Sequence, residues 1–460
     1  MNWKRITYFQ YASARGYRFP AFYSAFSREF RAGDIGNIAS KMLGRLLSHC
    51  QAHVPFYAGV MKASGRPNPV GSGPDHRLPS LPILTKDKIL AHFDELRSSD
   101  LPSRQWTYNT SGGSTGEPVR LIQDRDYADR SKAITFLYYS LLGYETGQPM
   151  IRLWGSERDI EGHTKTFKSK FFNWLTNTSY LNAFKMTPER MREFIQTLNT
   201  IRPKLIVAYA QAMYELAVFA ESEDIKVEPQ RAVVTSAGTL YPFMRAKIAT
   251  VFGCQVYNLY GSREVSDMGC EIPGSEGLWV APWGNYLEVV DDSGQPVPPG
   301  TEGNILVTCL TNYAMPLIRY QIGDRGALLP ASRSGFNPPG QVLKCVTGRN
   351  VDMFRTRNGT LVDGEYFTHL LYFRPWVRKF QVVQKNRNHV LFKILKPAQP
   401  PPKTELTEIG ERTRLAMGQD CSVNFEFVEE LPPHPSGKYR YTISEVTACS
   451  APSTSLDCKL

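Results

Sequence analysis

The sequence lacks any apolar run long enough to span a bilayer. Its longest candidate, residues 205–220, is too short and contains Gln211 and Glu215. The first residues are basic and aromatic, with no apolar stretch followed by a cleavage site, so no secretory signal peptide is expected. The eight cysteines include no C-x-x-C pair, which favours reduced thiols over a disulfide framework. These absences predict a soluble, cytoplasmic protein that is at most peripheral to a membrane.

What is present is an ordinary globular composition. Hydrophobic residues make up 42% and charged residues 21% of the 460 positions, which excludes collagen, coiled coil and wholesale disorder. The length exceeds what one core usually supports, so we expect two or more domains. The net charge of +11 suits anionic substrates, nucleotides or a phospholipid surface. The excess is diffuse after residue 50 and no recognised module is present, so we expect no nucleic-acid partner.

Residues 1–34 form a basic, aromatic lead segment. The first fifty residues hold eight Lys and Arg against two acids, interleaved with Trp, Tyr and Phe. One interpretation is peripheral docking on an acidic membrane or partner through aromatic and cationic side chains. The other is that the aromatics cover their own domain and leave the arginines in water. The lack of a clean helical stripe favours the second interpretation.

Clear helical periodicity begins at Ile35. Apolar residues recur at helical spacing up to Cys50, and Asp34 is the candidate N-cap. The helix should end before His53-Val-Pro55, because a proline disfavours α geometry in the residue that precedes it. Residues 64–82 are a connector rich in Gly, Pro and Ser, and Thr85 is the candidate N-cap of a short helix.

From residue 104 onward, β-rich runs alternate with helical ones. Strands are predicted at 106–108, 119–122, 150–154, 204–208, 231–235 and 255–258, and helices at 188–199, 211–223 and 242–252. This alternation implies a largely parallel sheet covered by helices. After Gly284 the strands become short and broken by turns, with runs at 286–290 and 304–309. A helix at 403–418 belongs to a further α+β region.

The predicted fold class is therefore α/β. We expect a large N-terminal domain of mixed and parallel sheets covered by helices, with a β-rich subdomain, at residues 1–346. A small, mobile C-terminal α+β domain should follow at residues 347–445, which is a normal domain size. Residues 446–460 are predicted to be a disordered tail.

A glycine-rich loop runs from Thr110 to Pro118 between two predicted strands. Its glycines would bring backbone N–H groups close to a phosphate, and its hydroxyls would add donors without bulk. A strand follows and no lysine follows the last glycine, so this is not a Walker A loop. A flexible surface turn is the alternative. The candidate phosphate-binding residues are Thr110, Ser111, Gly112, Gly113, Ser114, Thr115 and Gly116.

This loop resembles the phosphate loop of the adenylate-forming enzymes, the acyl-CoA synthetase superfamily. Other motifs of that superfamily recur in order: Asn258-Leu-Tyr-Gly-Ser-Arg-Glu264, Arg319-Tyr-Gln-Ile-Gly-Asp324, Thr347-Gly-Arg-Asn-Val-Asp-Met-Phe354 and His434-Pro-Ser-Gly-Lys438. The short length, Val54-Pro-Phe-Tyr57 and Leu81-Pro-Ile-Leu-Thr-Lys86 resemble the phenylacetate–CoA ligase-like branch. Within it, the glycine loop resembles that of capsular polysaccharide biosynthesis adenylating proteins. The resemblance spans about residues 43–440 and implies the adenylate-forming enzyme fold.

The resemblance also implies a reaction. A small carboxylic acid attacks the α-phosphate of ATP with Mg²⁺, giving an acyl-adenylate and pyrophosphate, and coenzyme A then displaces AMP. An amine or hydroxyl acceptor in surface polysaccharide synthesis is the alternative acceptor. A non-catalytic nucleotide-binding relative is an alternative of another class. Because attacker and target are both anionic, positioning and electrostatics should dominate the catalysis.

The matching motifs suggest a role for each candidate residue. Lys438, Glu264 and Arg263 are the candidate catalytic residues, with Glu264 holding Mg²⁺ and Lys438 reaching the α-phosphate. Beyond the glycine loop, the expected nucleotide contacts are Ser236, Ala237, Gly238, Asn258, Tyr260, Gly261, Asp324 and Arg349. The expected acyl pocket is formed by Tyr209, Ala237 and Gly238. Asp324 suits ribose hydroxyls because a carboxylate only accepts hydrogen bonds. For each residue the plainer interpretation is a turn, a buried strand end or an exposed charge.

Some positions depart from the superfamily's pattern. Val119 stands where a lysine is frequent, and Arg120, on the other strand face, cannot simply replace it. Arg263 stands where a phosphate-contacting Thr or Ser is usual, and Val351 where the hinge acid is expected. These departures motivate the non-catalytic alternative and weaken the case for coenzyme A. Zinc at the scattered cysteines Cys254, Cys270 and Cys309 is not expected, because a zinc site needs about four N or S ligands.

Overall fold

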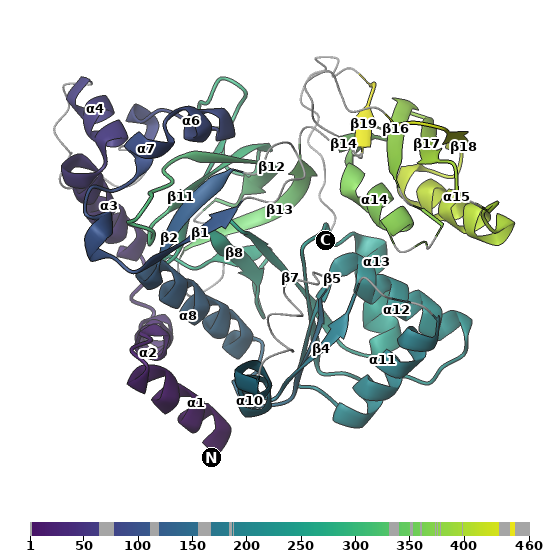
Figure 1. The fold of residues 1–460 in the computed structure, drawn as a ribbon, viewed down its shortest axis with the longest axis horizontal. Coiled ribbons are helices and arrows are strands. Elements are labelled where there is room, and N and C mark those ends of the chain that lie inside the picture. The colour runs from purple at the N-terminus through teal and green to yellow at the C-terminus, as the bar shows by residue number, and fades with distance from the viewer. Residues whose placement is uncertain are drawn as a thin grey trace.

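The computed structural model of the chain is shown in Figure 1. The residues that the structure describes are 2–63, 78–110, 119–154, 167–183, 186, 188–330, 340–349, 353–358, 361–372, 374, 376–377, 379–397, 399–431 and 442–446. A large sheet lies at the centre, helices cover it, and the C-terminal strands and helices gather to one side (Figure 1).

The large sheet joins a parallel half to an antiparallel half. Its strand order is β10-β11-β12-β13-β9-β8-β7-β6-β5-β3-β4. Neighbours from β4 to β7 pair in parallel, whereas β7 and β8 pair antiparallel. The strands of the parallel half are β3 (Met150–Trp154), β4 (Thr178–Asn182), β5 (Leu205–Tyr209), β6 (Ala232–Ser236) and β7 (Gln255–Ser262). Strand β7 therefore belongs to both halves.

Helices connect the parallel strands, as parallel pairing requires a crossover from one end of the sheet to the other. They are α10 (Phe167–Thr176), α11 (Pro188–Ile201), α12 (Ala210–Ser222) and α13 (Pro242–Phe252). The helix α8 (Arg125–Leu141) precedes β3. Figure 1 shows α11, α12 and α13 side by side on one face of this half.

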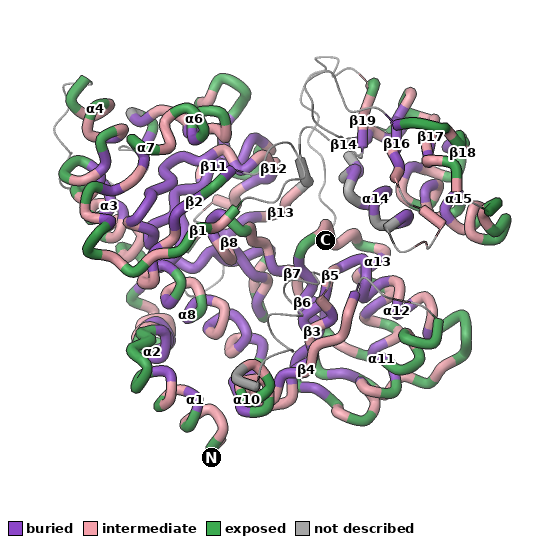
Figure 2. Tube along the Cα trace, in the orientation of Figure 1, coloured by how far each residue is buried: buried purple, intermediate pink, exposed green. Residues whose placement is uncertain are grey.

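The antiparallel half is built from short strands joined by turns. They are β8 (Ser266–Glu271), β9 (Leu278–Val280), β10 (Asn285–Val290), β11 (Gly303–Cys309), β12 (Tyr320–Leu328) and β13 (Gln341–Arg349). Strand β11 is buried along its whole length. Figure 2 shows the buried residues along the central strands and the exposed ones along the outer helices and turns.

The N-terminal segment wraps this sheet with helices and a hairpin. Its elements are α1 (Trp3–Ala14), α2 (Phe19–Ala32), α3 (Ile38–His53), α4 (Pro55–Ala63), α6 (Lys86–Ala91), α7 (Phe93–Leu96), the 3₁₀ turns η1 (Leu78–Ser80) and η2 (Leu101–Ser103), β1 (Trp106–Thr110) and β2 (Arg120–Asp124). The strands β1 and β2 pair antiparallel and flank the glycine-rich loop. That loop, residues 111–118, lies outside the described residues.

The C-terminal part has its own sheet, in the order β18-β17-β16-β19. Its elements are β14 (Met353–Arg355), β15 (Leu361–Asp363), α14 (Gly364–Tyr372), β16 (Phe380–Asn386), β17 (His389–Leu395), α15 (Lys403–Met417), β18 (Ser422–Val428) and β19 (Thr442–Ser444). It packs against α12 and α13. The ring of Tyr366 on α14 lies 5.7 Å from that of Tyr241, and Arg412 on α15 pairs with Glu215 on α12.

Many sequence-based predictions are confirmed. The helix predicted at 242–252 has those bounds, Thr85 accepts a hydrogen bond from Lys88 N as an N-cap, and the mixed α/β architecture is present. One prediction is wrong. The helix expected from Ile35 begins at Ile38, with Asn37 rather than Asp34 at its N-cap. The parallel sheet predicted from the alternation of strands and helices is confirmed for β3 to β7, and the short strands after β7 join the same sheet in antiparallel pairs.

The aromatic lead segment is helical, and it mostly covers its own domain. Tyr8, Phe19, Tyr23 and Phe26 are buried, as the second interpretation predicted, while Trp3 remains exposed. No helix within the described ranges combines the length and the apolar character that crossing a bilayer would need.

Candidate functional site

The candidate residues on β7 lie where its pairing changes from parallel to antiparallel. Asn258 is the last residue of β7 in register with β6, and Leu259 is the first in register with β8. The backbone N–H of Asn258 donates to Glu271 at 2.8 Å, and Arg245 on α13 donates to both oxygens of that carboxylate at 2.7 and 2.9 Å. Both bonds come from Arg245 Nη2, and since hydrogen bonds between charged groups are stronger than neutral ones, they anchor the start of the motif.

Gly261 allows β7 and β8 to approach closely. A Cβ atom at this position would lie 3.0 Å from the Ser266 carbonyl oxygen and 3.0 Å from Asp267 Oδ1. The register between the two strands shifts at this point, between Tyr260 and Gly261. A larger residue would push the strands apart, so glycine is needed here for packing.

Tyr260 and Asp324 meet across the sheet. The Tyr260 hydroxyl donates to Asp324 Oδ2 at 2.7 Å, although 64 residues separate them. Asp324 on β12 also pairs in register with Arg349 on β13. Three residues predicted from separate motifs are therefore brought together. A carboxylate can accept several hydrogen bonds at once, so the bond from Tyr260 is compatible with the ribose contact expected of Asp324.

Glu264 lies in the turn between β7 and β8 and is 8% exposed, whereas the preceding Arg263 is exposed. The hairpin of β1 and β2 holds this turn. Asn109 Nδ2 donates to the Arg263 carbonyl at 3.0 Å, and Gln123 Nε2 donates to the carbonyls of Arg263 and Glu264 at 3.0 and 3.1 Å. The strands that flank the glycine-rich loop are thus fixed to the turn that carries the expected Mg²⁺ ligand.

Asn109, Gln123 and Tyr127 are positioning residues that the sequence interpretation missed. The Tyr127 hydroxyl also donates to the Glu264 carbonyl, at 3.4 Å. For Asn109 and Gln123, the signal that could have found them was a polar residue near the end of each strand around the glycine loop, whereas Tyr127 lies on α8. Their partners lie about 140 residues further along the chain, which no local pattern indicates.

Thr110 is the only described member of the predicted phosphate loop, and it is exposed at the end of β1. The remaining members, residues 111–116, lie outside the described residues, as does Lys438. Val119 is buried, and Arg120 places its guanidinium 3.5 Å from the centroid of the Tyr108 ring. This agrees with the expectation that Arg120 does not take the place of the usual lysine.

The predicted acyl-pocket residues follow β5 and β6. Tyr209 and Ser236 are in register across these strands, and the Tyr209 ring lies 4.5 Å from that of Trp154 on β3. Ala237 has φ +54°, in the left-handed region. That conformation costs a non-glycine residue about 1–2 kcal/mol, and such strain is frequent at functional sites. Ser236, Ala237 and Gly238 therefore stand in a constrained turn beside Tyr209.

Asp267 on β8 is a partly buried acid in register with Gly261 on β7. Desolvation raises the pKa of its carboxyl, while hydrogen bonding from Thr135 and attraction to the partly buried Arg152 act in the opposite direction. Trp154 and Asp267 were not among the predicted site residues. Both are placed near the candidate site by the sheet rather than by sequence proximity.

The cysteines considered for zinc pack in different hydrophobic clusters. Cys309 lies among the side chains beneath the antiparallel strands and Cys270 among those around α8 and Trp279. Cys254 is partly buried beside α13. Burial raises the pKa of each of these thiols.

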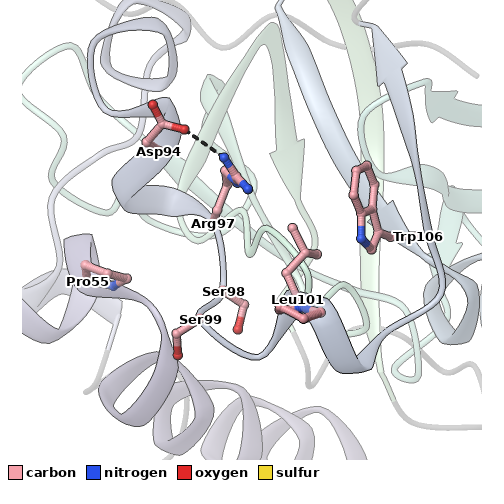
Figure 3. Close-up of a pocket in the computed structure, with 8 residues that line it drawn as sticks. Pro55, Asp94, Arg97, Ser98, Ser99, Leu101 and Trp106 are labelled. Carbon is pink, nitrogen blue, oxygen red and sulfur yellow. Dashed lines mark hydrogen bonds and ion pairs between the residues drawn. The ribbon is translucent and has the colours of Figure 1, made fainter.

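A cavity of about 400 Å³ lies away from these residues, beside α7 and η2 (Figure 3). Asp94 and Arg97 form an ion pair of 2.9 Å at its wall, and Trp106 at the start of β1 closes another side. It contains none of the predicted site residues.

Among the described residues, three side chains next to this cavity lie close enough together to bind one metal ion: His49, His53 and Asp100. Their hydrogen bonds favour a structural network instead. Ser98 Oγ lies between them, 3.1 Å from His49 Nε2 and 2.6 Å from Asp100 Oδ1. Arg104 donates to both Asp100 oxygens, at 2.9 and 2.7 Å, and lowers the pKa of that carboxyl. A cation would have to displace these partners.

Comparison with known proteins finds similarity to CapK and to phenylacetate–coenzyme A ligases. Residues 354–445 match the family model of the CapK C-terminal domain. The chain is 23% identical over 435 residues to protein CapK of Staphylococcus aureus, with 92% of each chain covered. It is 29% identical over 175 residues to the phenylacetate–coenzyme A ligase of Aromatoleum evansii, covering 36% of this chain and 38% of the relative.

Solved structures show the same fold. A 2-hydroxyisobutyryl-CoA ligase in the postadenylation state aligns with a TM-score of 0.59 at 17% identity, covering 88% of this chain and 89% of that chain. The same ligase in the thioesterification state, with its acyl-AMP and CoA, aligns with a TM-score of 0.57 at 16% identity, covering 91% and 90%. The resemblance read from the motifs is thereby supported: the chain is similar to protein CapK over most of its length and to a phenylacetate–coenzyme A ligase over part of it, and it shares the fold of the solved acyl-CoA ligase.

Proposed function

We propose that this protein activates a small carboxylic acid with ATP and Mg²⁺ as an acyl-adenylate and transfers the acyl group to coenzyme A. The observation that carries the proposal is the meeting of separate motifs. Tyr260 donates to Asp324 at 2.7 Å, Asp324 is in register with Arg349, and the glycine-loop hairpin bonds the Arg263–Glu264 backbone. A single nucleotide could touch all of these segments.

In the first step, a carboxylate oxygen of the acid bonds to the α-phosphorus of ATP and pyrophosphate leaves. We assign the phosphates to the glycine loop from Thr110 to Gly116 and to the exposed Arg263, whose guanidinium suits phosphate oxygens. The ribose hydroxyls would donate to Asp324, and the adenine would lie along Tyr260. Lys438 would stabilise charge on the α-phosphate as the bond forms.

Glu264 fits the expected Mg²⁺ ion. The residue is 8% exposed and lies in a turn whose backbone carbonyls accept hydrogen bonds from Gln123, and Mg²⁺ prefers one or two carboxylates together with phosphate oxygens. When bound, the ion would neutralise phosphate charge during attack. Exposed acids such as Glu276 lack this fixed setting.

In the second step, the thiolate of coenzyme A attacks the acyl carbon and AMP leaves. The support for this acceptor is the likeness to a 2-hydroxyisobutyryl-CoA ligase solved with its acyl-AMP and CoA. We propose residues 1–346 and 347–445 as the two domains that enclose the site. An amine or hydroxyl acceptor is the second candidate, because the glycine loop resembles that of capsular polysaccharide biosynthesis adenylating proteins.

Hydroxylamine-trapped adenylation over a library of carboxylic acids tests the proposal. We expect one group of acids to give ATP-dependent hydroxamate, and Lys438→Ala to slow it by about 10²–10³-fold, the scale of one lost transition-state donor. Lys396→Ala, an exposed lysine of the same C-terminal part, is the matched control and should have no effect.

The acceptor is identified by adding coenzyme A or amino sugars to the active acid and measuring AMP release. Faster release with coenzyme A supports the thioester step, and faster release only with an amino sugar supports the second candidate. Calorimetric binding of ATP and Mg²⁺ without turnover of any acid would instead support a non-catalytic relative and overturn the proposal.

A further inference from the structure

Exposed aromatic side chains gather where α1 and α10 lie side by side. Trp3 is 56% exposed, Trp174 55% and Phe171 41%. The ring of Trp174 lies 5.9 Å from that of Trp3 and 5.9 Å from that of Phe171, so the rings form one continuous surface. We call these residues the aromatic patch. Figure 1 shows α1 and α10 together at one edge of the molecule, near the N-terminus.

The aromatic patch is not needed to hold the two helices together. Inner rings do that: Tyr11 lies 5.2 Å and Tyr8 lies 6.2 Å from the ring of Phe172 on α10. Tyr8 is buried, whereas the patch residues point outward. Contiguous exposed aromatics are costly in water and mark a surface that meets another apolar partner.

Basic side chains lie at the patch. Lys4 Nζ lies 5.2 Å from the Trp174 ring and donates to the Trp174 carbonyl at 3.0 Å. Lys170, next to Phe171 in sequence on α10, is exposed. The sequence of residues 1–28, which includes α1, contains five Lys and Arg and no acid. Among nearby cations, Arg5 is paired with Glu145 at 3.6 Å.

We propose that the aromatic patch docks on a membrane surface with anionic headgroups. Tryptophan rings prefer the interfacial layer of a bilayer, and the basic side chains around them are attracted by anionic lipid. The patch lies on the outer sides of two helices at an edge of the molecule, which suits a flat fluid surface. The proposal is independent of the adenylation steps, so either can fail while the other holds.

Vesicle sedimentation with the full chain tests this docking. The vesicles are phosphatidylcholine alone, or phosphatidylcholine mixed with an equal amount of phosphatidylglycerol. We expect binding to the mixed vesicles, little binding to phosphatidylcholine alone, and release as salt rises because salt screens the headgroup charges. Equal binding to both vesicles, or no binding to either, would overturn the proposal.

Variants locate the surface. Trp3→Ala with Trp174→Ala should lower the partition coefficient for mixed vesicles at least about tenfold, because both interfacial anchors are lost. Leu415→Ala, which removes a 47% exposed apolar side chain on α15, is the matched control and should bind as the natural chain does. A double variant that binds as tightly as this control would contradict the assignment.

Charge is tested separately, in case the tryptophan variant folds poorly. Lys170→Glu should weaken binding to mixed vesicles severalfold, whereas Lys396→Glu, at a distant exposed lysine, should not. Thermal unfolding checks that each variant is folded. An acidic polypeptide such as polyglutamate is added as a competitor. If the chain binds polyglutamate and ignores both kinds of vesicle, the surface recognises an acidic protein and the membrane proposal is wrong.

Discussion

The two halves of the large sheet are built differently, and the candidate site lies where they join. The parallel half, β3 to β7, depends on helical crossovers, and its strands are covered by α11, α12 and α13. The antiparallel half, β8 to β13, is connected by turns and covered largely by the N-terminal helices. Ligands of open α/β sheets bind outside strand ends where the topology changes. Strand β7, which pairs with both halves, carries Asn258 and Tyr260 at that position.

The junction of the two halves at β7, which we call the joint, also explains how residues distant in sequence meet. The parallel half provides Ser236 and Tyr209, the antiparallel half provides Asp324 and the β7–β8 turn provides Glu264. Changes at the joint should therefore impair chemistry, whereas changes inside either half should impair stability. The following predictions test this separation.

The largest expected effect is on stability. Ile206 on β5 and Ile305 on β11 are both buried, one in each half. Replacing either by alanine should lower the free energy of unfolding by about 2–5 kcal/mol, from lost burial and the cavity left behind. Urea unfolding followed by fluorescence measures it. Because β7 belongs to both halves, both variants should shift the same transition. Two separate transitions, each moved by one variant, would show that the halves are independent units.

The next effect concerns the joint itself. Glu264→Gln keeps the size of the side chain and removes the charge that we assign to Mg²⁺. Pyrophosphate exchange with an active acid should fall by about 10²–10³-fold, the typical loss on removing one electrostatic group at a transition state. The unfolding midpoint should stay unchanged. Glu276→Gln, at an exposed acid after β8, is the matched control. Full activity of Glu264→Gln would remove this residue from the site.

A smaller effect is expected at the antiparallel side of the joint. Asp324→Asn should weaken ATP binding by about 10–100-fold, because hydrogen bonds to charged groups contribute about 1.5–3 kcal/mol. The KM for ATP should rise while the KM for the acid stays nearly constant. Equal changes in both KM values would point to a general distortion of the sheet rather than a ribose contact.

The smallest effect concerns the bond that crosses the joint. Tyr260→Phe removes the hydroxyl that donates to Asp324 and keeps the ring. This bond would act on ATP only indirectly, by holding the Asp324 carboxylate in place, so ATP binding should weaken by about tenfold or less, which is less than the loss of the carboxylate itself. In the Asp324→Asn background the same change should have less effect, and a double-mutant cycle measures this coupling. Fully additive effects would mean that the two residues act independently.

Much of the fold was predictable because its signals are local. The helix Pro242–Phe252 has a proline at its start and a glycine after its end, and Thr85 caps its helix by a bond to Lys88, three residues away. The start of α3 was misjudged at Asp34 because a cap residue and a turn residue look alike in sequence. The antiparallel half was underestimated for another reason. Whether short strands join an existing sheet depends on pairings between distant segments.

The candidate site likewise has one part that the sequence predicted and another that it did not. Asn258, Tyr260, Asp324 and Arg349 were predicted by motif resemblance, and the structure brings the last three together. The contacts of Asn109, Gln123 and Tyr127 with the Arg263–Glu264 backbone could not be predicted. These residues act through backbone carbonyls, which every residue has, so their partners leave no mark in the sequence.

The sequence by itself determined the order of strands and helices, the chemical types at the motifs that we propose to bind nucleotide and the basic, aromatic character of the first residues. Those properties depend on neighbouring residues along the chain. Tertiary structure alone decided that β7 would join two kinds of sheet, that Tyr260 would reach Asp324, and that Trp174 would complete an exposed surface with Trp3. The last two of these contacts join residues more than sixty positions apart, and they form only when the whole core packs.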